Sequence, residues 1–227
     1  MKTVGIIGGM GPEATILLMQ KVLAAVAASD DAGHIPLIVH QNTAVPSRIK
    51  RLIECRGDDP GPVLAQMARS LAAAGADALA MPCNTAHAYV PQIAEATTLP
   101  FLDMRQVTID QLTIALAPGA RIGMLASPAV RMAGVFDELF AKAGLTPVFV
   151  HNEVQLLGLI RQIKAGDTGP LVQAELHQLA AMLDKTSDHL LVACTELSLL
   201  TKTLTDFAWT DSLDCLASSI VAFAQTT

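Results

Sequence analysis

Short apolar runs rich in valine and isoleucine alternate along the chain with longer amphipathic stretches. The first run, residues 3–8, predicts a strand, and a glycine turn then leads to a helix expected over 12–28, with Pro12 suited to the first helical position. The run at 36–41 predicts a second strand, and a short amphipathic piece is expected at 45–55. Strands that alternate with helices in this way predict a parallel sheet of the α/β class.

The alternation of apolar runs and amphipathic stretches continues over roughly the next 60 positions. Asp59-Pro60 opens a helix that ends at Gly75, and an apolar run then stops at a proline directly before Cys83. We expect further helices at 86–97 and 103–117, with a brief strand at 99–102 between them.

From residue 121 the order begins again, which indicates an internal duplication. Three segments of the second half resemble segments of the first: 121–128 resembles 3–10, 148–152 resembles 38–42, and 188–194 resembles 77–83. The two cysteines lie 111 positions apart (83 to 194), and so do the two valines that precede a histidine (39 to 150). A last strand at 207–210 and a helix at 211–225 complete the chain.

We therefore predict two similar α/β units that face each other about an approximate two-fold axis. The first domain is expected to comprise residues 1–102 together with 209–227, because the C-terminal tail is expected to pack back on the first unit. The second domain is expected to comprise residues 103–208. Equivalent strand ends of the two units then converge on one cleft.

A thiol follows the end of one apolar strand in each half, Cys83 after Ala78-Leu79-Ala80-Met81-Pro82 and Cys194 after Leu190-Leu191-Val192-Ala193. Ligands bind at this edge of parallel α/β sheets. A helix N-terminus favours negative charge, so a thiol placed there ionises more readily. Two thiols on opposite faces of one carbon suit stereochemical inversion, in which one thiolate removes a proton and the opposite thiol supplies another.

Composition excludes several other classes of protein. Hydrophobic residues make up 52% of the 227 residues and charged residues only 16%, as suits strands covered on both faces. The net charge of −6 and the lack of a basic run argue against a nucleic-acid partner. No apolar run is long enough to span a bilayer, so no membrane association is expected and a cytoplasmic location is predicted. Cys55 and Cys215 are expected to be small core residues.

The chain resembles the aspartate/glutamate racemase family, which works without pyridoxal phosphate. The segments that carry the resemblance are 5–12 (GIIGGMGP), 45–48 (VPSR), 81–87 (MPCNTAH) and 193–196 (ACTE). The resemblance implies two Rossmann-like domains, a cleft between them, a two-cysteine mechanism without a cofactor, a small-molecule substrate and a homodimer. It is closest to aspartate racemases, which implies interconversion of L- and D-aspartate; glutamate or a broader range of amino acids is the alternative.

The resemblance also implies the residues that hold the substrate. Asn84, Thr85 and Thr195 are expected to form the cradle for its α-carboxylate, and Met10 to line the turn after the first strand. Glu196 is expected either to orient or polarise Cys194 or to cap its helix.

Two cations are implied for the side-chain carboxylate of the substrate. Arg48 corresponds to the residue that recognises this group in aspartate racemases, and Lys164 resembles its partner from the second domain. An acidic residue can precede the arginine in relatives, and this chain has Ser47 there. Lys164 also stands just before Gly166, where a lysine stabilises a helix C-terminus without any role in binding.

Other interpretations of these residues remain open at this point. Cys83 and His87 lie four positions apart, so a helix places both on one face, where they suit a metal ion or a packed histidine. Gly9-Met10-Gly11 begins a loose dinucleotide-binding fingerprint, but the second strand ends in His40-Gln41-Asn42 without an acid for the ribose. A non-catalytic amino-acid sensor also suits a two-domain cleft, although a binder has no need of two opposed thiols.

Overall fold

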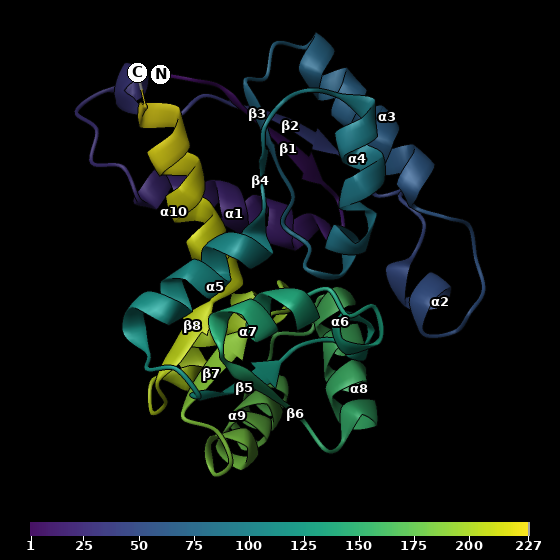
Figure 1. Ribbon diagram of the computed structural model, residues 1–227, viewed down its shortest axis with the longest axis vertical. Coiled ribbons are helices and arrows are strands. Elements are labelled where there is room, and N and C mark those ends of the chain that lie inside the picture. Colours follow the sequence, from purple (N-terminus) through teal and green to yellow (C-terminus); the bar gives the residue numbers. More distant parts are fainter. Residues whose placement is uncertain (227) are drawn as a thin grey trace.

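The computed structural model describes residues 1–226 and shows two parallel four-stranded sheets flanked by helices (Figure 1). The expected α/β fold is confirmed. The first sheet has the order β2-β1-β3-β4 and the second the order β6-β5-β7-β8. The strands are β1 (Val4–Gly8), β2 (Leu37–Gln41), β3 (Ala78–Ala80), β4 (Phe101–Leu102), β5 (Arg121–Leu125), β6 (Thr146–Phe149), β7 (His189–Val192) and β8 (Trp209–Asp211).

Helices cover both faces of each sheet, which explains why the central strands are apolar throughout. The α-helices are α1 (Pro12–Ala24), α2 (Arg48–Leu52), α3 (Gly61–Ala73), α4 (Val90–Ala96), α5 (Met104–Ala115), α6 (Pro128–Met132), α7 (Asp137–Ala143), α8 (Glu153–Lys164), α9 (Pro170–Asp184) and α10 (Ser212–Gln225). Three 3₁₀ segments are η1 (Asp31–Gly33), η2 (Thr85–Tyr89) and η3 (Leu197–Leu204). Among the described residues, no helix has both the length and the apolar character that crossing a bilayer requires.

The strand register confirms the duplication and corrects one of its correspondences. Val4 pairs with both Leu37 and Ala78, and in the second sheet Ile122 pairs with Pro147 and His189. The second strands are therefore related by a shift of 110 positions (37 to 147), not by the 111 expected from the two valines.

The counterpart of Val39 is accordingly Phe149, and the expected match with Val150 is wrong by one residue. The physical reason is that the connection from the first to the second strand is eight positions shorter in the second half, 25 from Ile122 to Pro147 against 33 from Val4 to Leu37. Val150 therefore lies beyond the end of β6. A slip of one position in a strand moves a side chain to the opposite face of the sheet.

The final helix of each half crosses to the other half. α5 follows β4 of the first sheet, yet its Ile109 and Leu112 pack in the core of the second sheet. α10 follows β8 of the second sheet, yet Leu216 and Ile220 pack in the core of the first. Figure 1 shows α5 next to the end of α10 that adjoins β8, and α10 runs from there alongside the first half. We call these two elements the crossover helices.

The C-terminal tail thus packs back on the first half, as expected. The expected boundary at residue 209 is wrong, however, because β8 pairs with β7 and residues 209–211 belong to the second sheet. The rest of the proposed division into two domains is unchanged by this finding. Each crossover helix begins at an aspartate N-cap, Asp103 for α5 and Asp211 for α10.

A few element boundaries differ from the expected ones. α1 ends at Ala24 instead of residue 28, and the helix expected over 86–97 is split into η2 and α4. Pro91 explains the split, because proline has no backbone N–H and cannot continue a helix from the preceding turn. The expected core position of Cys55 is wrong: this residue is exposed, in a turn with φ of 49° after α2. Cys215 is half-buried.

Candidate active site

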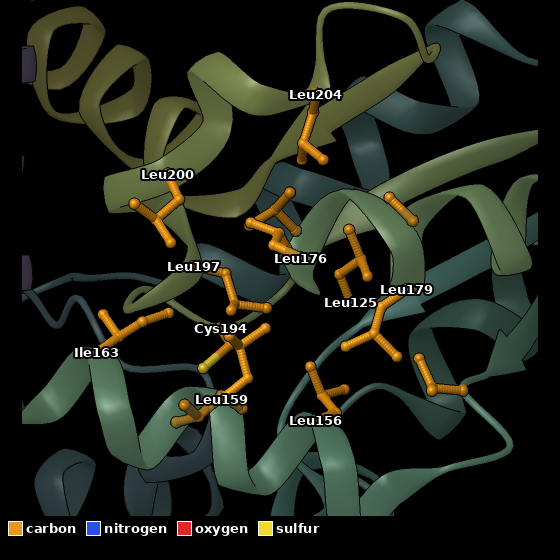
Figure 2. Packing of buried hydrophobic residues seen from close by; sticks show 14 of the residues in the cluster. Leu125, Leu156, Leu159, Ile163, Leu176, Leu179, Cys194, Leu197, Leu200 and Leu204 are labelled. Carbon is orange, nitrogen blue, oxygen red and sulfur yellow. The ribbon is translucent and has the colours of Figure 1, made fainter. Parts of the chain in front are cut away.

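The two cysteine turns lie at equivalent places, each just beyond a central strand. Pro82 ends the first apolar run, and the Cys83 N–H folds back to the Met81 carbonyl at 2.9 Å. In the second half, the Cys194 carbonyl accepts from the Leu197 N–H at 2.9 Å and so starts η3. Cys83 is 7% exposed and Cys194 6%. In Figure 2 Cys194 lies at the edge of a leucine-rich core, beside Leu159 of α8.

Both thiols line one small cavity of about 80 Å³ between the two halves. Seven of the nine residues predicted for the site line this cavity: Met10, Arg48, Cys83, Thr85, Lys164, Cys194 and Glu196. Strand ends from both sheets therefore converge, as the duplication predicted. A larger groove of about 720 Å³ between α5, β8 and α10 contains neither of these two cysteines.

Glu196 connects Cys194 to a cation. The Cys194 thiol donates to Glu196 Oε2 at 3.1 Å, and the other oxygen of the same carboxylate forms an ion pair with Lys164. Burial raises the pKa of the Cys194 thiol well above its usual range, the Glu196 carboxylate raises it further, and the Lys164 ammonium opposes them. Cys194 therefore rests as a thiol.

Lys164 is held in its charged form by the same contacts. Burial lowers the pKa of this amine, but the charge and the hydrogen bond of the Glu196 carboxylate oppose that effect, and the net shift is upward. Lys164 lies at the last residue of α8, and Ile160, four positions earlier on the same helix, lines the same cavity.

Replacing Glu196 by glutamine is expected to lower the pKa of Cys194. The substitution removes a negative charge next to the thiol and leaves the Lys164 ammonium without its counter-ion, and both changes favour the thiolate. The measurement is the rate of iodoacetamide alkylation against pH, in a background where Cys55, Cys83 and Cys215 are serine. The alkylation profile should move to lower pH.

The matched control is Glu13→Gln, which removes an exposed carboxylate on α1. This variant should keep the parent profile. A Glu196→Gln profile that stays in place, or moves to higher pH, would show that the carboxylate does not act on the Cys194 thiol.

Arg48 reaches the cavity from the short helix α2. Ser47 caps this helix by accepting from the Lys50 N–H at 3.3 Å, so the position where relatives can carry an acid has a capping role here. Arg48 Nη1 donates to the carbonyls of Pro46 at 2.8 Å and Val45 at 3.3 Å. These bonds fix the guanidinium at the cavity wall and leave its remaining donors for a ligand, since Arg48 Nε is buried without a partner among the described residues.

Asn84 and Thr195 were expected to form part of a carboxylate cradle, but their side chains form hydrogen bonds across the two halves instead. Asn84 Nδ2 donates to Ser212 Oγ at 2.9 Å, at the start of α10, and Thr195 Oγ1 donates to the Pro82 carbonyl at 3.2 Å. Of the three residues predicted for the cradle, only Thr85 lines the cavity. The two turns are therefore tied directly to each other.

Both ring nitrogens of His87 are occupied by backbone groups, which removes it as a metal ligand. Nδ1 lies 2.9 Å from the Cys83 carbonyl oxygen, and Nε2 lies 3.3 Å from the Met104 N–H donor. Burial lowers the pKa of His87 to about 4, with Asp103 opposing. Within residues 1–226 no group of three His, Cys, Asp or Glu side chains is arranged to hold a metal ion. Of the two interpretations of His87, a metal ligand or a packed histidine, the structure supports the packed histidine.

The glycine turn after β1 is not an open phosphate cradle. The Gly9 N–H is already bonded to Thr15 Oγ1 at 3.0 Å, and Gly9 has φ of 95°. A Cβ at Gly9 would lie 2.3 Å from the Asn42 carbonyl oxygen, so glycine is required for close packing against the chain after β2. This geometry does not favour the dinucleotide-binding alternative.

Sequence reasoning missed four residues of the cavity wall: Ser47, Ile49, Ser127 and Ile160. The internal repeat could have predicted Ser127, because the shift of 118 positions that relates the first strands makes it the counterpart of Gly9. Its hydroxyl oxygen accepts from the Ala129 N–H at 3.3 Å and caps α6. The two isoleucines gave no signal, since an apolar residue on a helix is expected to face a core.

Comparison with known proteins yields a family and several relatives. The Asp/Glu/hydantoin racemase family model matches residues 7–220. A broad specificity amino-acid racemase of Bacillus subtilis (strain 168) is 26% identical over 225 residues, which cover 96% of each chain. An aspartate racemase of Picrophilus torridus superposes with a TM-score of 0.89 at 25% identity, covering 99% of this chain and 94% of the other. A Francisella tularensis glutamate racemase in complex with D-glutamate shares the fold, with a TM-score of 0.69 at 16% identity and coverage of 98% and 80%.

Proposed function

The chain belongs to the Asp/Glu/hydantoin racemase family, and from this premise we propose that it interconverts L- and D-aspartate without a cofactor. Racemase activity, which is an isomerase activity, is supported by the family and by the amino-acid racemases among the relatives. The observation that carries the proposal is the pair of buried thiols, one from each half, on the wall of one cavity that also holds Arg48 and Lys164.

In the proposed mechanism the thiolate of one cysteine removes the Cα proton, and the thiol of the other donates its proton to the opposite face. The amino acid leaves with inverted configuration, and the proton has moved from one sulfur to the other. Cys194, which rests as a thiol beside Glu196, is the proton donor when Cys83 is the base. The reverse direction begins with the Cys194 thiolate and the Cys83 thiol, which is the state in which a forward turnover leaves the two sulfurs.

The carbanion formed in this reaction has no electron sink other than its own carboxylate. Fixed hydrogen-bond donors in a cavity without bulk water stabilise such charge best, because they need no reorganisation when it develops. Thr85 and the N–H groups of the two cysteine turns are the donors we assign to this role, together with the backbone near Met10. The interlocking bonds of Asn84 and Thr195 hold these turns in place.

The two cations of the cavity support an acidic amino acid as substrate. Arg48 and Lys164 contribute two positive charges, against one negative charge on Glu196 and one on the thiolate that acts as base. Aspartate has a second carboxylate for these cations to bind, and alanine has none. In the empty site Lys164 pairs with Glu196, and we propose that it turns toward the side-chain carboxylate when substrate enters.

Broad specificity, as named for the Bacillus subtilis relative, is the second candidate function. The single carboxylate of Glu196 favours it, because Lys164 can remain paired there while a neutral amino acid occupies the cavity. Glutamate is a further candidate substrate within the same mechanism. From the family resemblance alone we also propose a cytoplasmic homodimer.

The test is incubation of the purified protein with each L-amino acid in heavy water, read by chiral chromatography with mass detection. D-Aspartate should form fastest and should carry deuterium at Cα, while the remaining L-aspartate stays largely protonated at early times. Equal deuterium in both enantiomers would indicate a single exchangeable base. Absence of any D-product would contradict racemase activity, and binding without turnover would identify a sensor.

Sensitivity to inhibitors provides an independent check of the cofactor-free proposal. Activity should survive chelators and hydroxylamine, and it should fall on thiol alkylation, against which aspartate should protect by filling the space between the sulfurs. Loss of activity on dialysis against a chelator, restored by zinc, would contradict the proposed chemistry.

A further inference from the structure

His87 occupies an unusual place between the Cys83 turn and a crossover helix. Its ring is 1% exposed and does not line the cavity. Nδ1 lies 2.9 Å from the Cys83 carbonyl oxygen, and the first N–H of α5, that of Met104, points at Nε2 from 3.3 Å. A backbone N–H can only donate, so Nε2 accepts and Nδ1 carries the ring hydrogen. The neutral imidazole thus serves as a donor at one end and an acceptor at the other.

The groups around the ring do not require His87 to carry a charge, because the nearby carboxylate already has a cationic partner. Asp103 Oδ1 lies 3.6 Å from Nε2, but the two oxygens of this carboxylate already accept from Arg105 Nε at 3.0 Å and Nη2 at 2.6 Å. Phe101 packs against the ring in a T-shaped arrangement, with centroids 5.5 Å apart. The contacts of His87 are therefore those of a fixed neutral bridge and not of a proton carrier.

The equivalent position in the second half also reaches the start of a crossover helix, but it lacks the bond to the cysteine carbonyl. A shift of 111 positions relates His87 to Ser198, as it relates the two cysteines. Ser198 Oγ donates to Asp211 Oδ1 at 2.8 Å and does not contact the Cys194 carbonyl. That carbonyl accepts from the backbone of its own turn, as the Cys83 carbonyl also does from the Ala86 N–H at 3.1 Å. The imidazole bond is thus an addition specific to the Cys83 turn.

We propose that His87 is a positioning residue for Cys83, which fixes the turn of this cysteine to the start of α5. This inference rests on the proposed racemase function. α5 packs in the core of the second sheet, the half that carries Cys194. His87 therefore locates one thiol relative to the half that holds the other. A two-base inversion depends on that relation, because both sulfurs must approach the same carbon from opposite sides.

The experiment compares His87→Leu with His87→Gln. Leucine fills the buried space without polar atoms, whereas the glutamine amide supplies one donor and one acceptor, as the neutral ring does. We expect His87→Leu to lower kcat for aspartate by about 100-fold, the cost of a small misplacement of a reacting group, with KM changed little. His87→Gln should recover most of the loss.

Isotope effects distinguish positioning of Cys83 from a general structural role. Substrate deuterated at Cα is assayed as both enantiomers. In His87→Leu the isotope effect should rise for the enantiomer whose Cα–H faces Cys83, since that step becomes slower. It should fall toward unity for the other enantiomer, where Cys194 removes the deuteron and the later proton transfer from Cys83 limits the rate. A general loss of structure changes the two effects alike.

The control is Ser198→Ala, which removes the corresponding side chain from the second half and should leave the two isotope effects in their wild-type relation. If His87→Leu does not fold, His87→Asn replaces it, because the shorter amide cannot span both bonds and should give the same opposed pattern. Parallel isotope effects, or failure of glutamine to restore activity, would overturn the role of His87. Failure of the wild-type protein to racemise any amino acid would overturn the proposed function instead.

Discussion

Replacement of Cys83 or Cys194 by serine is expected to lower kcat for aspartate racemisation by about 10²- to 10⁴-fold, the usual contribution of a general acid or base. Serine preserves the size of the side chain, so the buried turns should keep their structure. Its hydroxyl group is far too weak an acid to exchange protons with Cα near neutral pH. Either substitution should slow inversion in both directions, because each face of the carbon depends on its own sulfur.

The measurement is the initial rate in both directions, by chiral chromatography, with circular dichroism to confirm folding. The matched controls are Cys55→Ser and Cys215→Ser, which alter an exposed and a half-buried cysteine outside the cavity. Both controls should retain nearly full activity. If either Cys83→Ser or Cys194→Ser remained as active as these controls, the two-thiol mechanism would have to be abandoned.

Replacement of Arg48 by alanine is expected to reduce kcat/KM selectively for acidic substrates. Losing one partner of a buried charge pair costs about 2–5 kcal/mol. At 1.4 kcal/mol per factor of ten, this corresponds to a loss of roughly 30- to 3,000-fold with aspartate. Alanine as substrate carries no side-chain carboxylate, so its turnover should change little. Arg48 is the cleaner test of the two cations, because removing Lys164 also leaves Glu196 unpaired beside Cys194.

The control for this prediction is Lys50→Ala, which removes an exposed positive charge from the same short helix. Lys50→Ala should leave the preference for aspartate over alanine intact. An equal loss on aspartate, glutamate and alanine in Arg48→Ala would assign the arginine to the structure of α2, whose preceding carbonyls it binds, and not to substrate recognition.

The sequence was a good guide to the strands and to the cleft. The alternation of apolar runs and amphipathic stretches predicted a parallel α/β fold, and the repeated cysteine turns predicted that two thiols from distant segments would meet. Arg48 and Lys164 were predicted for the site only from the family resemblance, since each is otherwise an ordinary helical cation. Placing them together required knowledge of how the halves face each other.

Other features depend on tertiary contacts that a local pattern does not encode. An amphipathic helix such as α10 shows which of its faces is apolar but not which sheet that face will cover. The side chains of Asn84 and Thr195 have the chemistry of a carboxylate cradle, yet partners across the halves occupy them. The match of Val39 with Val150 failed because the connection between the first and second strands is eight residues shorter in the second unit (25 positions from Ile122 to Pro147 against 33 from Val4 to Leu37), so like residues fall at unlike positions.

The crossover helices have a consequence for the order in which the protein can be completed during synthesis. Strand β1 is made before the other elements of the two sheets, but the apolar surface formed by Val4 and Ile6 is covered in part by α10, which follows all of them in the chain. Lys2 is even bonded through its backbone N–H to the Ala224 carbonyl, at 2.9 Å. Chains generally fold domain by domain as they emerge, and a surface left open in that interval is prone to aggregation. The core of the first half is therefore completed only after α10 has been made, and a premature stop before residue 212 would leave the apolar surface of β1 without the helix that covers it.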